Sequence, residues 1–175
     1  QQFTHYILQE DEREIGIGSN NIKAVYVDEQ KSLVYIGTHA GGLTVLHRNS
    51  GKMESFNQLN SQLVNENVYA ILPDKGGNLL LGTLSALVSF NPEKKSFTTI
   101  DKEKDGTPFT SQRITILFRD SHKRLWVGGE EGISVFQQEG IEIEKVPILP
   151  ESSVTKTFTN CIYEAANGII WVGTR

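Results

Sequence analysis

The sequence predicts an all-β protein built from repeated antiparallel sheets of four strands. The first observation is a short apolar motif that occurs four times and closes on glycine, at Gly37, Gly82, Gly128 and Gly173. These glycines follow one another at intervals of 45, 46 and 45 residues. The second observation is that each repeat holds several short apolar stretches separated by turn-forming residues. Such a period is typical of a β-propeller, whose sheets, or blades, pack face to face around a channel.

The first predicted strand of each repeat is the apolar segment that precedes the glycine motif. It ends at an acidic residue in every repeat: Asp28, Asp74, Asp120 and Glu164. Because these segments are mostly apolar instead of alternating, we expect them to be the most buried strands of each unit. The recurring acid favours a turn-capping role over a catalytic one, since an active site does not need one copy in every repeat.

The glycine motif is the second predicted strand, and turn residues join it to the first strand as a hairpin. We expect its glycines to allow close backbone approach between neighbouring sheets. A large side chain two positions before each glycine is predicted to fill the gap between sheets: Tyr35, Leu80, Trp126 and Trp171. Stacking of the tryptophans on sugars is the alternative, but the presence of leucine and tyrosine at the same position favours packing.

The third predicted strands are Gly42–Leu46, Ala86–Phe90 and Gly132–Phe136, and a more polar fourth stretch follows each of them. Charged residues alternate in the last of these stretches, which fits an exposed outer strand that deters edge pairing. We therefore predict one partial β-propeller domain of three complete four-stranded antiparallel blades with partial blades at both ends. Its parts are an outer strand with a linker, three blades and a final pair of strands, at residues 1–18, 19–64, 65–110, 111–156 and 157–175.

The ends of the sequence predict an unfinished ring. Phe3–Leu8 resembles the outer strand of an otherwise missing blade, and Arg175 lies two strands into a further one. We therefore expect a piece of a longer polypeptide. Unpaired strand edges recruit other chains, so the expected partners are the remaining blades of that polypeptide or a second copy, in a dimer.

Composition limits the function classes. The chain is 38% hydrophobic with a net charge of −4, and it has no apolar run of membrane-helix length, so a membrane would be contacted only through regions outside this sequence. The absence of a Lys/Arg cluster argues against nucleic acid as a partner. The histidines lack metal-ligand spacing, and no metal or other cofactor is expected. Cys161, the only cysteine, is expected to be a buried and inert thiol.

The better functional candidates lie at one rim of the propeller. In a four-stranded blade, the loop between the second and third strands and the connection to the next blade emerge on the same face. Binding residues concentrate on such loops, and these loops differ among the repeats. The candidate ligand-binding residues are His39, Ser85, Arg113 and Glu130. Unselected drift of loop sequences predicts the same variation. No catalytic residue is assigned.

The repeat also resembles a known family. An asparagine, spaced apolar residues, an aspartate, a turn, Leu-Trp-Ile-Gly-Thr and Gly-Gly-Leu form the pattern of the two-component regulator propeller repeat. Asn21–Leu43 matches it most fully, and Asn67–Leu87 and Arg113–Ile133 match with substitutions. Thr157–Thr174 matches its first half, so the resemblance covers nearly the whole chain. Departures include Leu80 for tryptophan, Gly129 for threonine, and Arg113 and Thr157 for asparagine.

This resemblance implies the periplasmic sensor region of a bacterial hybrid two-component system, notably of gut Bacteroidetes. Such regions typically detect oligosaccharides released from glycans and signal across the inner membrane to a histidine kinase. The implied role is non-catalytic sensing of a small-molecule or oligosaccharide ligand. The family supplies no residue-level binding motif.

Two alternatives stay open. Similar repeats occur in lyases resembling the streptogramin-inactivating enzymes, whose site would need a histidine or a carboxylate with metal on the channel face. His39 with Glu130 is the nearest possibility for such a site, and the sequence does not show that these two residues meet. A protein-interaction scaffold would instead use apolar rim residues, which here are Leu59, Leu63, Phe109 and Leu149.

Overall fold

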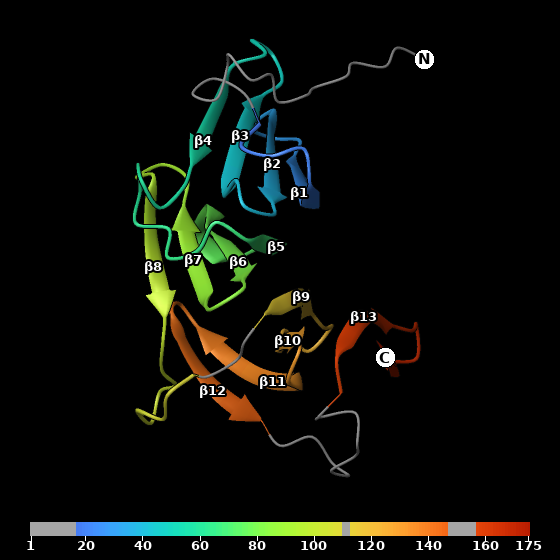
Figure 1. Ribbon diagram of the computed structural model, residues 1–175. Helices are drawn as coiled ribbons and strands as arrows, with labels where there is room; N and C mark the ends of the chain where they lie inside the picture. Colours follow the sequence, from blue (N-terminus) through green and yellow to red (C-terminus); the bar gives the residue numbers. More distant parts are fainter. Residues whose placement is uncertain (1–16, 110–112, 147–156) are drawn as a thin grey trace.

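The computed structural model describes residues 17–109, 113–146 and 157–175. Within them lie three four-stranded antiparallel sheets and one two-stranded sheet, which confirms the predicted class of propeller blades. The sheets follow one another along an arc (Figure 1). The predicted strand Phe3–Leu8 lies outside the described residues, and so do parts of the predicted units 1–18, 65–110 and 111–156.

Each strand pairs with the one that precedes it in the same sheet, so every sheet is a simple meander. The first sheet contains β1 (Ile22–Asp28), β2 (Leu33–Thr38), β3 (Leu43–His47) and β4 (Met53–Phe56). The second contains β5 (Val68–Pro73), β6 (Leu79–Thr83), β7 (Leu87–Asn91) and β8 (Ser96–Ile100), with the 3₁₀ turn η2 (Lys75–Gly77). The third contains β9 (Ile114–Arg119), β10 (Leu125–Gly129), β11 (Gly132–Glu139) and β12 (Glu142–Val146). The last contains β13 (Thr159–Glu164) and β14 (Ile170–Thr174).

The central strands, not the first strands, are the most buried parts of each sheet. Every residue of β6 is buried, whereas β1 contains no buried residue. The prediction from the apolar first segments is therefore wrong. The physical reason is position: β1, β5 and β9 form one edge of their sheets, while the central strands have a neighbour on both sides. The same prediction fails at Cys161 in β13, which is exposed.

Neighbouring sheets touch where a motif glycine meets the first strand of the next sheet. A Cβ atom added to Gly82 would lie 2.6 Å from Ile114 Cγ2 and 2.8 Å from the Ile114 carbonyl oxygen. A side chain at this position would therefore force the two sheets apart. The same contact joins each successive pair of sheets, through Gly37–Val68, Gly82–Ile114 and Gly128–Thr159. Gly173 instead lies against Cys161 of its own sheet.

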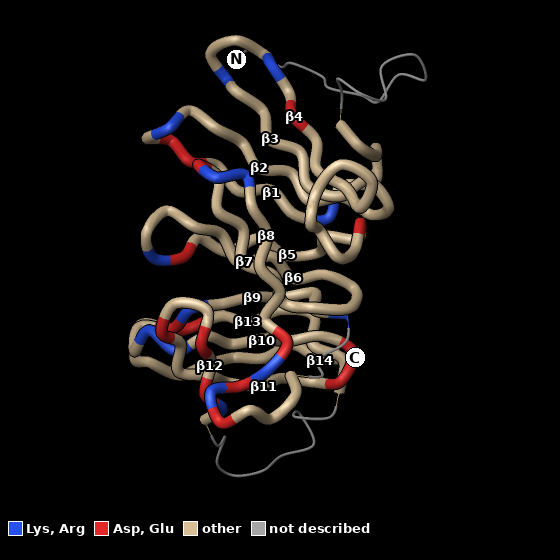
Figure 2. Tube along the Cα trace, turned by 90° about the vertical axis from the view of Figure 1, so that its left-hand side faces the viewer, with Lys and Arg blue, Asp and Glu red and all other residues tan. Residues whose placement is uncertain are grey.

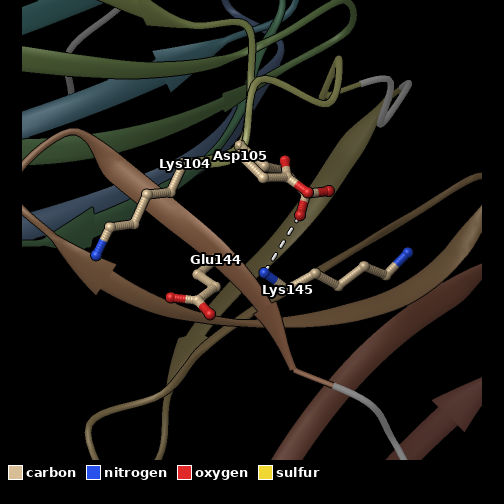
Figure 3. A pocket seen from close by; sticks show the side chains of 5 residues that line it. Lys104, Asp105, Glu144 and Lys145 are labelled. Atoms are coloured by element: carbon tan, nitrogen blue, oxygen red, sulfur yellow. Dashed lines mark hydrogen bonds between the residues drawn. The ribbon is translucent and has the colours of Figure 1, made fainter.

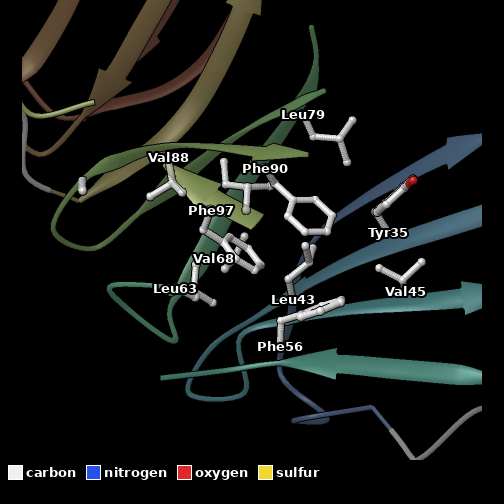
Figure 4. Close-up of a cluster of buried hydrophobic side chains, with 12 residues drawn as sticks. Tyr35, Leu43, Val45, Phe56, Leu63, Val68, Leu79, Val88, Phe90 and Phe97 are labelled. Atoms are coloured by element: carbon white, nitrogen blue, oxygen red, sulfur yellow. The ribbon is translucent and has the colours of Figure 1, made fainter. Parts of the chain in front are cut away.

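A separate apolar cluster fills the space between each pair of neighbouring sheets. In the first cluster, Phe90 stacks on Phe97 with ring centroids 4.5 Å apart and meets Tyr35 edge-on at 6.5 Å (Figure 4). Burial, followed by the charge of Asp28, raises the pKa of Tyr35 to about 12. The hydroxyl of Tyr35 therefore stays neutral inside this interface at physiological pH.

The large side chains of the motif have two different environments. Tyr35, Leu80 and Trp126 are buried, and Trp126 is only 7% exposed. Trp171 is 64% exposed, so the inter-sheet packing predicted for it is not found among the described residues. The difference follows from the order of the sheets. Each of the first three side chains is covered by the sheet that follows it, and Trp171 lies in the last described sheet.

Only some of the recurring acidic residues cap the turn that follows their strand. Asp28 accepts a hydrogen bond from the Lys31 backbone N–H at 3.0 Å, as the prediction requires. Asp74 makes no such cap and instead forms an ion pair with Arg119 of the third sheet, at 3.0 Å. Gln138 Nε2 donates to the same carboxylate at 2.9 Å. Asp74 therefore joins two sheets. Residues of both charge signs occur along the loops at this turn end of the sheets (Figure 2).

The fourth acid does not occupy the predicted position. Glu164 pairs with Ile170 as Arg119 pairs with Leu125, so Ala165 takes the place that Asp120 has in the third hairpin. Glu164 is the last residue of strand β13 and not a turn residue. Its carboxylate accepts hydrogen bonds from the hydroxyl and the backbone N–H of Ser121 in the third sheet. Glu164 therefore also connects sheets instead of capping its own turn.

Asp120 is the acid with the most complete set of partners. Its carboxylate accepts hydrogen bonds from Trp126 Nε1 at 2.8 Å, from Arg124 Nε at 2.6 Å and from the Arg124 backbone N–H at 2.8 Å. Burial works to raise the pKa of Asp120, but these hydrogen bonds and the charge of Arg124 outweigh it and hold the pKa below the ordinary 3.8. The third hairpin is thereby tied to the packing tryptophan.

The two tryptophans provide a matched test of packing. We expect Trp126→Ala to lower the free energy of unfolding by about 3 to 5 kcal/mol, because it leaves a cavity between two sheets. Trp171→Ala removes a mostly exposed side chain and should change it by about 0.5 kcal/mol or less. Urea unfolding of both variants measures the difference. Equal stabilities of the two variants would contradict the assigned packing.

Asp120 predicts a pH dependence of stability. A carboxyl group whose pKa is lowered on folding stabilises the folded state above its unfolded pKa and loses that contribution as the pH falls below it. Stability should therefore decline below pH 3.8. Asp120→Asn should cost about 1.5 to 3 kcal/mol at neutral pH and reduce the acid-dependent loss. Unfolding curves at pH 6 and pH 3 measure both effects. An unchanged pH dependence would show that Asp120 is not the responsible group.

Candidate functional site

Every first strand contains a one-residue bulge at the same end. The register shifts lie between Ile22 and Ala24, and at the equivalent points of β5, β9 and β13. The extra residues are Lys23, Tyr69, Thr115 and Asn160. At this end the second strand leads into the loop to the third strand, so the bulges lie at the predicted rim. A bulge redirects side chains and is over-represented next to active sites.

Tyr69, at the second bulge, contacts two of the predicted binding residues. The ring of His39 lies 6.2 Å from the Tyr69 ring, and His39 Nδ1 lies 3.4 Å from the Tyr69 hydroxyl. The guanidinium carbon of Arg113 lies 5.7 Å from the centre of the same ring. His39 follows β2, Tyr69 belongs to β5 and Arg113 precedes β9. These three residues, here named the rim cluster, therefore join three successive sheets.

A backbone hydrogen bond joins Arg113 to the loop that carries Ser85. The Arg113 N–H donates to the carbonyl of Leu84, the neighbour of Ser85, at 2.8 Å. Thr83 Oγ1 accepts the N–H of Ser85 at 3.3 Å and donates to the carbonyl of Ala86 at 2.8 Å, which fixes the loop that carries Ser85. Arg113 has a φ of +46°, a value that is uncommon for a residue with a side chain. Strained backbone of this kind is concentrated at ligand-binding sites.

Asn67 positions the loop that carries His39. Its Oδ1 accepts the N–H of Ala40, the neighbour of His39, at 3.1 Å. Its Nδ2 donates to Asn65 Oδ1 at 3.1 Å, so the orientation of the amide is supported from both sides. The loop after β2 is thus attached to the second sheet. Asn67 is a functional candidate that the sequence analysis did not select, although asparagine at this position of the repeat is its signal.

The fourth repeat begins one residue later in the structure than the match of Thr157 to the asparagine of the repeat pattern predicts. The carbonyl of Asn21 accepts the N–H of His39 at 2.9 Å, and the carbonyl of Phe158 accepts the N–H of Arg175 at 3.1 Å. Phe158, not Thr157, therefore occupies the asparagine position of the last repeat. Arg175 also lies over the Phe158 ring, with its guanidinium carbon 5.8 Å from the ring centre.

Glu130 lies at the same rim but on the third sheet. It follows Gly129, which pairs with Ile114, so Glu130 and Arg113 flank the last pair of that hairpin. Glu130 and His39 belong to loops of the third and first sheets, and the structure does not join them as the lyase alternative requires. Among the described residues, no group of three or more His, Cys, Asp or Glu side chains could hold a metal ion.

A second surface feature lies at the outer edge of the third sheet. A groove of about 490 Å³ is lined by Glu103, Lys104, Asp105, Glu144 and Lys145 (Figure 3). Lys104 N–H donates to the Ile143 carbonyl at 2.8 Å, and Lys145 N–H donates to Glu103 Oε2 at 3.2 Å. Glu103 and Lys104, from the segment between β8 and β9, therefore cover the edge of β12. Residues 110–112 lie outside the described ranges.

The apolar residues of the scaffold alternative do not form a common surface. Leu59 is exposed, but Leu63 is buried in the first core cluster. Phe109 packs edge-on against Phe136 with ring centroids 5.5 Å apart. Leu149 lies outside the described residues. His39 and Arg113, in contrast, share a contact with Tyr69, and a hydrogen bond to Leu84 joins Arg113 to the loop of Ser85.

Comparison with known families and proteins finds similarity to two-component systems. The model of the two-component regulator propeller family matches residues 152–175. Over 157 residues the chain is 29% identical to histidine kinase P4 of Formosa agariphila. The aligned region makes up 83% of this chain and 11% of the kinase. No helix within the described ranges has the length and apolar character needed to cross a membrane.

Solved structures share the fold at low sequence identity. The extracellular domain of the hybrid two-component system BT3049 of B. thetaiotaomicron matches with a TM-score of 0.74 at 20% identity, covering 98% of this chain and 23% of that one. The extracellular domain of BT4673 of the same organism gives 0.54 at 17%, covering 88% and 26%. A protein described as a gluconolactonase gives 0.57 at 12%, covering 87% and 57%. The chain thus spans a small part of the two-component proteins that it resembles.

The two asparagines at the starts of the first two repeats provide a matched test of loop positioning. Asn67→Ala should lower the free energy of unfolding by about 1 kcal/mol, because the Ala40 N–H and the Asn65 side chain each lose a partner. Asn21→Ala, at the exposed equivalent position, should leave stability within about 0.5 kcal/mol of the unchanged protein. Thermal and urea unfolding measure both. A neutral Asn67→Ala would contradict the role of its side chain in holding the loop.

Proposed function

We propose that this chain, which carries the two-component regulator propeller repeat, is a non-catalytic ligand-sensing segment of a hybrid two-component system. The family match, the relationship to a histidine kinase and the fold shared with extracellular domains support this proposal. We propose an oligosaccharide as the ligand and the periplasm as the location. The similar structures are described as extracellular domains, which favours the outer side of the inner membrane.

The rim cluster is the single observation that carries the proposal. His39, Tyr69 and Arg113 come from three successive sheets, and His39 and Arg113 both contact Tyr69. Ser85 lies on the adjoining loop and Glu130 on the next one. Donors and acceptors of this kind can match the hydroxyl groups of a sugar. Because the ligand would touch several sheets together, it would favour one relative arrangement of them, which is the property that a sensor needs.

Further blades of the same polypeptide are the proposed structural partners. Val25 of β1 and Trp171 of β14 are both exposed, at the two ends of the arc of sheets. In a propeller each sheet face is covered by the next blade, and exposed apolar faces of this kind are typical of interaction surfaces. A second copy of the chain is the alternative. Light scattering of the complete polypeptide distinguishes a closed monomer from a dimer.

Binding and stability should separate at the rim. We expect alanine substitution of His39, Ser85, Glu130 or Arg113 to weaken oligosaccharide binding. The free energy of unfolding should change by about 0.5 kcal/mol or less, because substitutions at exposed loop positions usually have small effects. His122→Ala, at the opposite end of the sheets, is the control. A thermal-shift screen of oligosaccharides identifies the ligand, since a ligand at 100 times its Kd adds about 2.7 kcal/mol. Equal affinities in all four variants and the control would exclude this rim.

A further inference from the structure

The described arginines divide into two groups according to the end of the sheets at which they lie. Arg48, Arg119 and Arg124 lie at the turn end, and each forms an ion pair with an acidic side chain. Arg113 and Arg175 lie at the rim, and each is placed over an aromatic ring, as Arg124 is at the turn end. The four ion pairs among the described residues include neither of these two. No described acidic side chain therefore neutralises either rim arginine in an ion pair.

The guanidinium group of Arg113 lies beside Tyr69, with its central carbon 5.7 Å from the centre of the ring. None of the ion pairs among the described residues includes this group, which carries five N–H donors. The backbone of Arg113 is fixed by the hydrogen bond to Leu84. A guanidinium group held in this way loses little freedom on binding. Its fork of donors matches the two oxygens of a carboxylate or a sulfate.

We propose that the rim cluster recognises the anionic group of an acidic oligosaccharide, a carboxylate or a sulfate, through Arg113. This inference rests on the proposed function and specifies its ligand. Tyr69 is a positioning residue, because it holds the guanidinium and does not itself need to touch the anion. His39 also contacts Tyr69 and can donate a further hydrogen bond. Glu130, next to Arg113 in the register, accepts from sugar hydroxyl groups.

Matched ligand pairs test the proposal. The probes are trigalacturonic acid with its fully methyl-esterified form, and cellobiose 6-sulfate with cellobiose, measured by calorimetry. We expect at least one acidic probe to bind about tenfold or more tightly than its neutral form, the effect of one hydrogen bond to a charged group. The pair that shows the difference identifies the anion. Binding of the acidic form should weaken as salt is raised, since the exposed charges are screened.

Variants separate the charge of Arg113 from its shape. Arg113→Gln should remove the preference for the acidic form, and Arg113→Lys should retain only part of it, because lysine lacks the planar fork. Tyr69→Leu should weaken acidic binding more than neutral binding, which a purely structural role would not produce. Arg48→Gln, at the turn end, should keep the full preference.

The outcomes distinguish this inference from the proposed function. Equal binding of acidic and neutral probes would overturn the anion proposal while leaving oligosaccharide sensing in place. A full acidic preference in Arg113→Gln would overturn the role of Arg113. Failure of every acidic and neutral probe to bind would count against both proposals.

Discussion

The close contact between a motif glycine and the first strand of the next sheet is the constraint on which the remaining structure depends. At the Gly82–Ile114 contact, the backbone of one sheet has no room for a side chain before it meets the next. This spacing allows Tyr35, Leu80 and Trp126 to fill the gaps between sheets. It also sets how far apart successive rims lie. The loop of one sheet can therefore reach the bulged strand of the next, as His39 reaches Tyr69.

The two ends of the sheets use charge in different ways. At the turn end, arginines meet carboxylates, and the pair of Asp74 with Arg119 connects two sheets. A partly buried pair with a hydrogen-bonded neighbour restricts the relative position of those sheets more than an exposed pair would. At the rim, Arg113 lies on an aromatic ring, in the neighbourhood of strained backbone and a bulge. One end of the sheets is thus held by ion pairs between sheets, whereas the arginine at the other end has no ion-pair partner among the described residues. This difference suits a scaffold that presents a binding surface.

The repeat period made the fold predictable, because it reports how strands alternate with turns regardless of the contacts between them. Single-residue shifts were not predictable. No particular residue type marks the bulge at Tyr69 in the sequence. The acid Glu164 lies one residue before the position of the recurring acid, to which sequence alignment had assigned it. Burial of Trp126 and exposure of Trp171 depend on which sheet covers them, and the identical local motif cannot report that. At the candidate site, loop position pointed to His39 and Arg113, whereas their shared contact with Tyr69 required the three-dimensional arrangement.

Substitution of Gly82 tests most directly whether close sheet contact determines the position of the rim. Gly82→Ala, followed by urea unfolding and by NMR signals of Tyr69 and Arg113, measures stability and rim geometry in one protein. The contact predicts a loss of about 1 to 3 kcal/mol, because the added methyl group meets Ile114, together with shifted signals for both rim residues. Unchanged stability with unchanged signals would contradict it, since the two sheets would then be free to accommodate a side chain without moving the cluster.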